Sequence, residues 1–151
     1  AHAWVLARSD RPRSWTHFQR TLDSDIADVQ GGTTPEGIHT GAMAGTIDLV
    51  QRCFVGIDMR GNTLHFDPAL PDEIKRIRVR LRYRRQVLDV DVDHDRLMIE
   101  SRSYSASTIK LAYRGHYRDL APGESCRFKL IKPDERLRDE NRIGQARRAA
   151  E

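Results

Sequence analysis

A polar, glycine-rich segment between residues 31 and 45 runs directly into the predicted start of a helix that carries an acid and a histidine. Thr34 suits an N-cap position, Pro35 suits the first helical turn, and Glu36 favours the positive end of the helix dipole. Glu36 and His39 are three residues apart and share one face of this helix. The first backbone N–H groups of a helix have no partner inside it and can bind phosphate or a carboxylate. The segment therefore predicts a site for an anion or a sugar.

These residues also have a purely structural explanation. A single histidine near a helix start is often a surface residue or a core residue with satisfied hydrogen bonds. Glu36 could act only as a partner of the helix dipole. Gly41, Met43 and Gly45 are expected to pack rather than to bind a ligand. The residues alone thus leave a binding site and a packed helix start as two open interpretations.

The chain closely resembles the C-terminal part of glycoside hydrolase family 65, most specifically at residues 36–39 (Glu-Gly-Ile-His) and 41–45 (Gly-Ala-Met-Ala-Gly). The resemblance extends through residues 14–18, 25–30, 46–54, 64–71 and 81–84. It covers most of the chain up to about Leu130. Members of this family are phosphorylases, and some are hydrolases, of trehalose, maltose, kojibiose and related α-glucosides.

The resemblance implies a role for the glycine-rich segment. In the family the corresponding histidine lies at the mouth of the catalytic barrel, where it binds phosphate in phosphorylases or borders the water in hydrolases. His39, Thr33 and Thr34 are therefore expected at a phosphate or acceptor site, with Glu36 and Gly32 in supporting positions. The general acid of the family is a glutamate in an earlier part of the barrel, so no catalytic residue is expected in this chain.

The function implied by the resemblance is an inverting cleavage of an α-glucoside, by phosphorolysis or hydrolysis. The chain would be the C-terminal part of such an enzyme and inactive by itself. Expected partners are a disaccharide, phosphate or water, the remainder of the catalytic barrel and a second copy in a homodimer. No cofactor is expected beyond inorganic phosphate as a co-substrate. The choice among disaccharides, and between phosphate and water, stays open.

A non-catalytic β-sandwich that binds carbohydrate is the main alternative, because a β-sandwich can bind sugars by itself. Its tyrosines argue against an aromatic sugar platform, since they are spread over separate predicted elements: Tyr83, Tyr104, Tyr113 and Tyr117. For the β-rich part alone, a structural domain is the preferred interpretation.

The pattern of the chain predicts a helical first third, a β-rich middle and a charged tail. Helices are expected over 1–7, over 14–28 with Ser14 as the cap, and over 35–54. Strands are expected over 76–83, 88–93, 97–99, 108–113 and 126–130. Gly37, Gly41 and Gly45 lie on one line of the third helix, which predicts a close neighbouring backbone.

Together with this pattern, the family resemblance implies an α+β fold. The last helices of an (α/α)6 barrel (1–54) would be followed by a jelly-roll-like antiparallel β-sandwich (55–131). Residues 132–151 are expected to form a charged, solvated tail.

Arginines alternate with apolar residues over 76–83, and aspartates alternate with apolar residues over 88–93. A two-residue turn at Arg84 and Arg85 would fix the antiparallel register. It would set these pairs opposite one another: Arg80 and Asp89, Arg78 and Asp91, and Arg76 and Asp93. The turn lacks the glycine or asparagine that a tight hairpin prefers, so it is expected to be longer or strained.

Composition narrows the class of protein. The 26 basic residues are nearly matched by 22 acidic ones, and the arginine–aspartate ladder predicts a charge-paired sheet rather than a nucleic-acid-binding stripe. No apolar run approaches the ~20 residues needed to cross a bilayer, and no signal peptide is visible, so a cytoplasmic location without membrane contact is expected. Cys53 and Cys126 match no metal or redox spacing, so neither a metal site nor a disulfide is expected.

Overall fold

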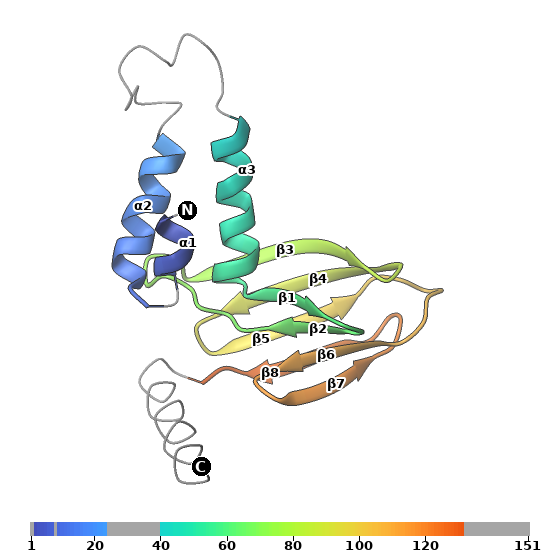
Figure 1. The fold of residues 1–151 in the computed structure, drawn as a ribbon. Helices are drawn as coiled ribbons and strands as arrows, with labels where there is room; N and C mark the ends of the chain where they lie inside the picture. Colours follow the sequence, from blue (N-terminus) through green and yellow to red (C-terminus); the bar gives the residue numbers. More distant parts are fainter. Residues whose placement is uncertain (1, 8, 24–39, 132–151) are drawn as a thin grey trace, which may run out of the picture.

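The computed structural model describes residues 2–7, 9–23 and 40–131 of the 151-residue chain. The helical elements are α1 (His2–Leu6), α2 (Arg11–Asp23), α3 (Thr40–Leu49) and the π-helical turn η2 (Val50–Phe54). The strands are β1 (Ile57–Arg60), β2 (Thr63–Phe66), β3 (Arg76–Tyr83), β4 (Gln86–Asp93), β5 (Arg96–Ser101), β6 (Ile109–Tyr113), β7 (His116–Leu120) and β8 (Ser125–Lys129). The helices stand at one end of the strands (Figure 1). The predicted charged tail lies outside the described residues.

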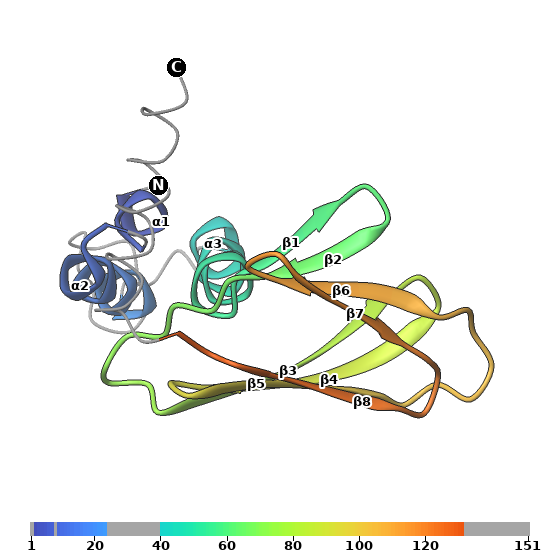
Figure 2. The same cartoon turned by 90° about the horizontal axis from the view of Figure 1, so that it is seen from below.

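The strands form two four-stranded sheets, in the orders β1-β2-β6-β7 and β3-β4-β5-β8. All neighbouring strands are antiparallel except β2 and β6, which are parallel. The two sheets lie face to face as two layers (Figure 2). Their inward side chains share one apolar core, which includes Phe66 and Leu111 from the first sheet and Val90 and Ile99 from the second. The described chain is therefore an α+β fold built on a β-sandwich, as the sequence predicts for its β-rich part.

One buried amide links the two layers. Gln86, at the start of β4, is fully buried, and its Nε2 donates to the carbonyl oxygens of Ser107 at 2.8 Å and Leu120 at 3.3 Å. Leu120 ends β7 in the opposite sheet. A buried donor that lost these acceptors would be left unsatisfied, so the contact fixes how the sheets meet.

The β3–β4 hairpin has the predicted register. Arg76 lies opposite Asp93, Arg78 opposite Asp91, and Arg80 opposite Asp89. The turn keeps two residues, and both adopt left-handed backbone angles, with φ of 48° at Arg84 and 67° at Arg85. Side chains with a Cβ disfavour these angles. The turn is therefore short and strained, because the paired strands on both sides impose it.

The strand boundaries follow the sequence closely in the second sheet and less well in the first. The segments predicted at 97–99, 108–113 and 126–130 overlap β5, β6 and β8. The turn between β6 and β7 consists of Arg114 and Gly115, because His116 already begins β7. β7 was not predicted, since its residues from His116 to Asp119 are all exposed and show no buried face.

The start of α2 corrects one sequence prediction. The helix begins at Arg11 rather than Ser14, and the Asp10 carboxylate accepts the backbone N–H of Arg13 at 3.1 Å in the manner of an N-cap. Ser14 is fully buried instead, and its hydroxyl donates to the Ala3 carbonyl at 2.7 Å. The hydroxyl thus ties α1 to α2. The predicted extension of this helix over 24–28 lies outside the described residues.

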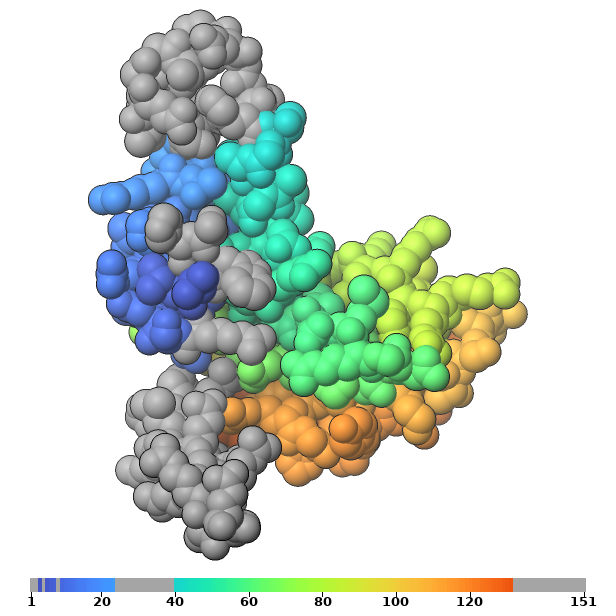
Figure 3. All heavy atoms as spheres, in the orientation of Figure 1, coloured from blue at the N-terminus to red at the C-terminus, as the bar shows by residue number. Residues whose placement is uncertain are grey.

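The glycine line of α3 faces open space in the described part of the chain. A Cβ built at Gly41 or Gly45 meets no heavy atom within 4 Å there, and both residues are exposed. The described residues therefore supply no close neighbouring backbone at these two positions, and the predicted neighbour stays a prediction. Gly37 lies outside the described residues. The open side of α3 is visible in the space-filling view, where the helix stands beside the strands (Figure 3).

A close backbone contact does occur where the helices join the sandwich. Gly56 has φ of 72°, and a Cβ there would lie 2.1 Å from the Asp67 carbonyl oxygen. Two backbone hydrogen bonds hold the strands of this crossing together, Asp67 N–H to Gly56 O and Ala69 N–H to Phe54 O, both at 2.9 Å. Only glycine fits this position, because the backbone angle and the neighbouring carbonyl both exclude a side chain.

Candidate functional site

The site residues predicted from the sequence are not among those the structure describes. Gly32, Thr33, Thr34, Glu36 and His39 all fall in the 24–39 gap. The described chain stops at Asp23, at the end of α2, and resumes at Thr40, the first residue of α3. Both of these helix ends lie on the side away from the sandwich (Figure 1). The structure therefore defines the two elements that flank the predicted site.

An aromatic cluster fixes α2 and the lower part of α3. Trp15 stacks on Phe18 with ring centroids 5.4 Å apart, and Phe18 meets Phe54 edge-on at 5.4 Å. Leu49 and Cys53 are buried in the same cluster. Three partly buried side chains pack against both this cluster and the sandwich core: Val50, Ile74 and Ile77. The flanking helices are thus anchored to the sheets.

A second candidate site lies on the outer face of the second sheet. A hollow of about 420 Å³ is bordered by three arginines and three carboxylates from β3, β4, β5 and the residue after it: Arg78, Arg80, Arg102, Asp89, Asp91 and Glu100. Met98, between these charged groups on β5, adds an apolar side chain. Along each strand, one inward-facing residue separates neighbouring charged residues, because outward positions recur every second residue.

Each aspartate of the hollow is shared by two arginines. Asp89 accepts Arg80 Nε at 2.6 Å, Arg80 Nη2 at 3.1 Å and Arg102 Nε at 2.8 Å. Asp91 accepts Arg76 Nε at 2.6 Å, Arg76 Nη2, and Arg78 Nε at 3.3 Å. The predicted charge-paired sheet is confirmed at Asp89 and Asp91.

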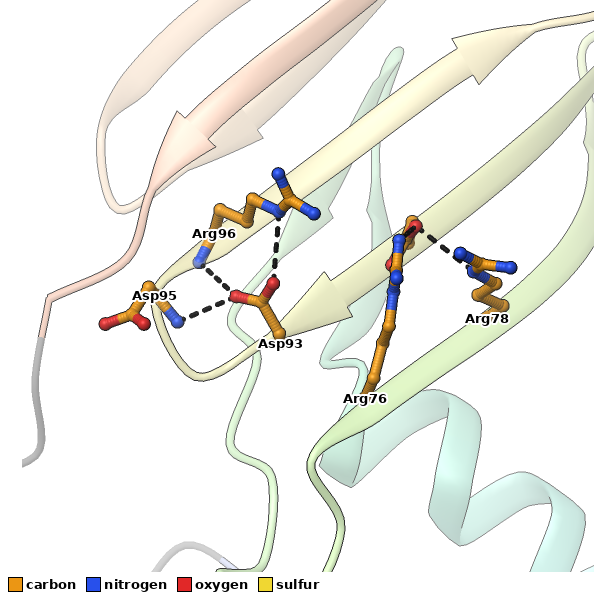
Figure 4. Close-up of polar contacts among 6 residues, drawn as sticks. Arg76, Arg78, Asp93, Asp95 and Arg96 are labelled. Atoms are coloured by element: carbon orange, nitrogen blue, oxygen red, sulfur yellow. Dashed lines mark hydrogen bonds and ion pairs between the residues drawn. The ribbon is translucent and has the colours of Figure 1, made fainter.

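One predicted pair has the predicted register but a different side-chain contact. Arg76 lies opposite Asp93, but its guanidinium donates to Asp91, two residues before Asp93 on β4. Figure 4 shows the Asp93 carboxylate beside Asp95 and Arg96. Asp93 instead accepts the backbone N–H groups of Asp95 at 2.9 Å and Arg96 at 2.8 Å, and Arg96 Nε at 3.0 Å. The Asp93 carboxylate therefore caps the β4–β5 turn, because the backbone N–H groups of the next few residues are its nearest donors. Arg76 hydrogen-bonds Asp91 instead.

The arginines change the ionisation of these acids. Hydrogen bonds from Arg80 and Arg102 hold the pKa of Asp89 well below its ordinary value. A hydrogen bond from Arg76 likewise lowers the pKa of Asp91, against the opposing effect of burial. Burial disfavours the charged form of Asp93, but the backbone N–H groups of Asp95 and Arg96 together with the Arg96 guanidinium outweigh burial and lower the pKa of Asp93. All three acids are carboxylates at neutral pH, which suits a role as fixed acceptors rather than proton donors.

Sequence reasoning predicted strands at β3, β4 and β5 but missed the charged residues that β5 and the residue after it add to this network. Arg102 and Glu100, which form an ion pair at 3.1 Å, were not singled out. The signal was present, since Arg96, Met98 and Glu100 alternate with the buried Leu97 and Ile99. What the sequence analysis lacked was the pairing of β5 with β4, which sets Glu100 opposite Asp89.

Other site types receive no support within the described residues. No group of three or more His, Cys, Asp or Glu side chains there could hold a metal ion. Cys53 is buried and Cys126 is half-buried, no disulfide joins these two described cysteines, and burial raises the pKa of the Cys126 thiol. No described helix is both long and apolar enough to span a membrane.

Comparison with known proteins connects this geometry to a family. The C-terminal domain of glycosyl hydrolase family 65 matches residues 57–117, a segment that runs from β1 into β7. A solved structure described as a kojibiose phosphorylase from the human microbiome has the same fold, with a TM-score of 0.72 at 17% identity over 85% of this chain and 17% of that one.

Two sequence relatives extend the match. An uncharacterized glycosyl hydrolase of Mycobacterium tuberculosis is 42% identical over 82% of this chain and 9% of the relative. The trehalose 6-phosphate phosphorylase of Lactococcus lactis is 30% identical over 72% of this chain and 14% of that enzyme. The chain thus spans less than a fifth of the length of these relatives. Residues 57–117 of the chain thus match the C-terminal domain of glycosyl hydrolase family 65, in agreement with the resemblance seen in the sequence.

Proposed function

We propose that this chain is the C-terminal part of an inverting enzyme that cleaves an α-glucoside such as trehalose or maltose, by phosphorolysis or hydrolysis. The observation that carries the proposal is the family 65 C-terminal domain at residues 57–117. Relatives named as phosphorylases support it: a trehalose 6-phosphate phosphorylase, a 1,2-α-glucosylglycerol phosphorylase of Bacillus selenitireducens and a maltose phosphorylase of Bacillus subtilis. Phosphorolysis is the reaction that these names share.

In this proposal, residues 1–54 complete the catalytic barrel. Apolar side chains of the helices remain open to solvent, with Val5 67% and Ile47 61% exposed. The described face of α3 at Gly41 and Gly45 is also open. Exposed apolar groups of this kind suit burial against further helices. The remaining barrel would bury them and would supply the general acid.

The proposed acceptor site combines His39, Thr33 and Thr34, with Glu36 and Gly32 in support. In an inverting cleavage, an acid protonates the leaving oxygen while phosphate, or a water activated by a base, attacks the opposite face of the sugar. A histidine N–H, hydroxyl groups and the N–H groups of a helix start are all donors to phosphate oxygens. These residues would therefore hold and orient the nucleophile without transferring a proton to the leaving group.

The sandwich itself is proposed as a structural support for the barrel. Its tyrosines do not suit an aromatic platform, because Tyr83 and Tyr113 are buried. The exposed ones lie in different parts of the sandwich, with Tyr104 (97% exposed) between β5 and β6 and Tyr117 (59% exposed) on β7. The cluster around Phe18 and Phe54 ties the helices to the sheets. This arrangement favours a scaffold over an aromatic carbohydrate-binding module.

Product analysis of the enzyme that contains this chain tests the proposal. Trehalose, maltose and kojibiose are each incubated with the enzyme, with and without inorganic phosphate, and the products are followed by proton NMR. Inversion at an α-linkage predicts that the first sugar released is the β-anomer, as β-sugar 1-phosphate or free β-sugar. Release of the α-anomer, or no cleavage of any of the three, would contradict the proposal.

A further inference from the structure

The outer face of the second sheet carries more positive than negative charge. The carboxylates of the hollow each neutralise arginines, but three further cations have no acid opposite them across the strands. Arg82 lies opposite Val87, Arg127 opposite Met98, and Lys129 opposite Arg96. All three of these cations are exposed. The field over the hollow is therefore positive, although the hollow's own lining is balanced.

The arginines of the hollow retain unused donors. A guanidinium has five N–H donors. Within the described residues, Arg78 uses only Nε, Arg80 uses Nε and Nη2, and Arg102 uses Nε and Nη1. The Asp89 and Asp91 carboxylates, by contrast, each accept hydrogen bonds from three donors. The hollow thus offers a surplus of donors and few free acceptors.

The shared carboxylates also hold the arginines in place. Asp89 bridges Arg80 and Arg102, and Asp91 bridges Arg76 and Arg78, so the guanidinium groups are oriented before any ligand arrives. Arginines fixed in this way lose less side-chain entropy when they bind. The volume of about 420 Å³ lies in the usual range for small-molecule sites, roughly 300–1,000 Å³.

We propose that this hollow is a binding site for a phosphate group, either inorganic phosphate or the phosphate of a small sugar phosphate. The guanidinium fork matches phosphate oxygens, which accept several N–H donors at once. Met98 provides an apolar contact for the carbon skeleton of a sugar phosphate. The site goes beyond the proposed function, since its described lining lies on β3, β4 and β5 and binding there involves no bond cleavage.

A neutral sugar fits the hollow less well than a phosphate. Each sugar hydroxyl both donates and accepts, so a sugar needs free acceptors as well as donors. Glu100 Oε2 is the carboxylate oxygen of the hollow for which the described residues show no hydrogen bond. The surplus of arginine donors and the positive field both favour an anion instead.

NMR on the ¹⁵N-labelled chain tests the site through the arginine Nε–H resonances. The probes are inorganic phosphate, glucose 6-phosphate and glucose. The Nε–H signals of Arg78, Arg80 and Arg102 should shift with both phosphates and stay unchanged with glucose. Tighter binding of glucose 6-phosphate would identify a sugar phosphate as the ligand, and equal affinity would identify the inorganic ion. Shifts caused by glucose alone, or no shift at these arginines with either phosphate, would overturn the proposal.

Matched variants separate a built site from a diffuse positive surface. Arg78→Gln should weaken phosphate binding by about fivefold, the upper end for an exposed charge pair, whereas Arg82→Gln on the same strand should change it little. Glu100→Gln removes a negative charge without removing a donor and should tighten binding. Equal weakening by Arg78→Gln and Arg82→Gln would contradict the site.

A third variant keeps this proposal distinct from the proposed acceptor site. His39→Ala should leave the shifts of the hollow arginines intact, because the described residues that line the hollow come from β3, β4, β5 and the residue that follows β5. Loss of those shifts in His39→Ala would overturn the second site. Their persistence in a chain whose parent enzyme shows neither phosphorolysis nor hydrolysis of an α-glucoside would support the hollow while contradicting the proposed function.

Discussion

At the scale of single residues, Gly56 is the position with the least freedom in the described chain. A side chain there would strike the Asp67 carbonyl oxygen at 2.1 Å while also meeting a backbone φ of 72°. Gly61 has a similar φ of 56° but open space around it. The two glycines therefore separate the cost of the backbone angle from the cost of the clash.

Gly56→Ala should destabilise the fold far more than Gly61→Ala. The angle alone costs about 1–2 kcal/mol in unfolding free energy, and Gly56→Ala must also displace the strand that carries Asp67. Urea denaturation of both variants measures the difference. Equal losses would show that the crossing between the helices and the sandwich tolerates a side chain.

Arg85 is a residue that the fold keeps in a conformation its side chain disfavours. Its φ of 67° follows from the two-residue turn between β3 and β4. Arg85→Gly should raise the unfolding free energy by about 1 kcal/mol, because glycine adopts this angle without strain. Thermal denaturation is the measurement. The control Arg82→Gly, inside β3, should lower stability, and a loss in Arg85→Gly as well would contradict the strained turn.

At the scale of elements, the outer face of the second sheet makes stability depend on pH. The arginine hydrogen bonds lower the folded-state pKa of Asp89 and Asp91 relative to the unfolded chain. Their stabilisation is therefore present above the ordinary aspartate pKa of about 3.9 and is lost as the pH falls through the lowered folded values.

The sheet should accordingly melt at lower temperature below about pH 4, and this loss should shrink in Asp89→Asn. The melting temperature is measured from pH 6 to pH 2 in low salt. Asp95→Asn serves as the control, since the Asp95 carboxylate is exposed and forms no part of the hollow. The prediction fails if Asp89→Asn and the unaltered chain lose stability in parallel.

The elements also show what the sequence could predict. The β3–β4 register follows from alternation and a two-residue turn, both of which are local. The predicted N-cap at Ser14 is wrong, because the Ser14 hydroxyl donates to the Ala3 carbonyl in another helix. The parallel pairing of β2 with β6 joins segments more than forty residues apart and leaves no local signal. The proposed acceptor site rests on the family resemblance, since its donors depend on segments of the enzyme beyond the residues described.

At the scale of the whole molecule, two apolar cores are joined into one body. Val50, Ile74 and Ile77 contact both the helical cluster and the sandwich core. The helices beside the sandwich are therefore held rigidly while their outer faces, with Val5 and Ile47, remain exposed. This arrangement supports the proposal that these helices complete a catalytic barrel.

The 151-residue chain by itself should show no phosphorolysis or hydrolysis of trehalose or maltose, because the proposed general acid lies outside it. Sugar release by the purified chain is measured against the complete enzyme under the same conditions. Turnover by the isolated chain, free of contaminating glycosidase, would mean that the acid is among these residues.

The central claim, that His39 belongs to the acceptor site, is tested by steady-state kinetics of the enzyme that contains this chain. His39→Ala should raise the KM for phosphate by about ten- to a hundredfold, since a hydrogen bond to a charged group contributes about 1.5–3 kcal/mol, with a smaller effect on the KM for the sugar. In a hydrolase the same change should instead lower kcat. His116→Ala, on the exposed start of β7, is the matched control. Unchanged kinetics in His39→Ala would contradict the account and assign His39 to packing.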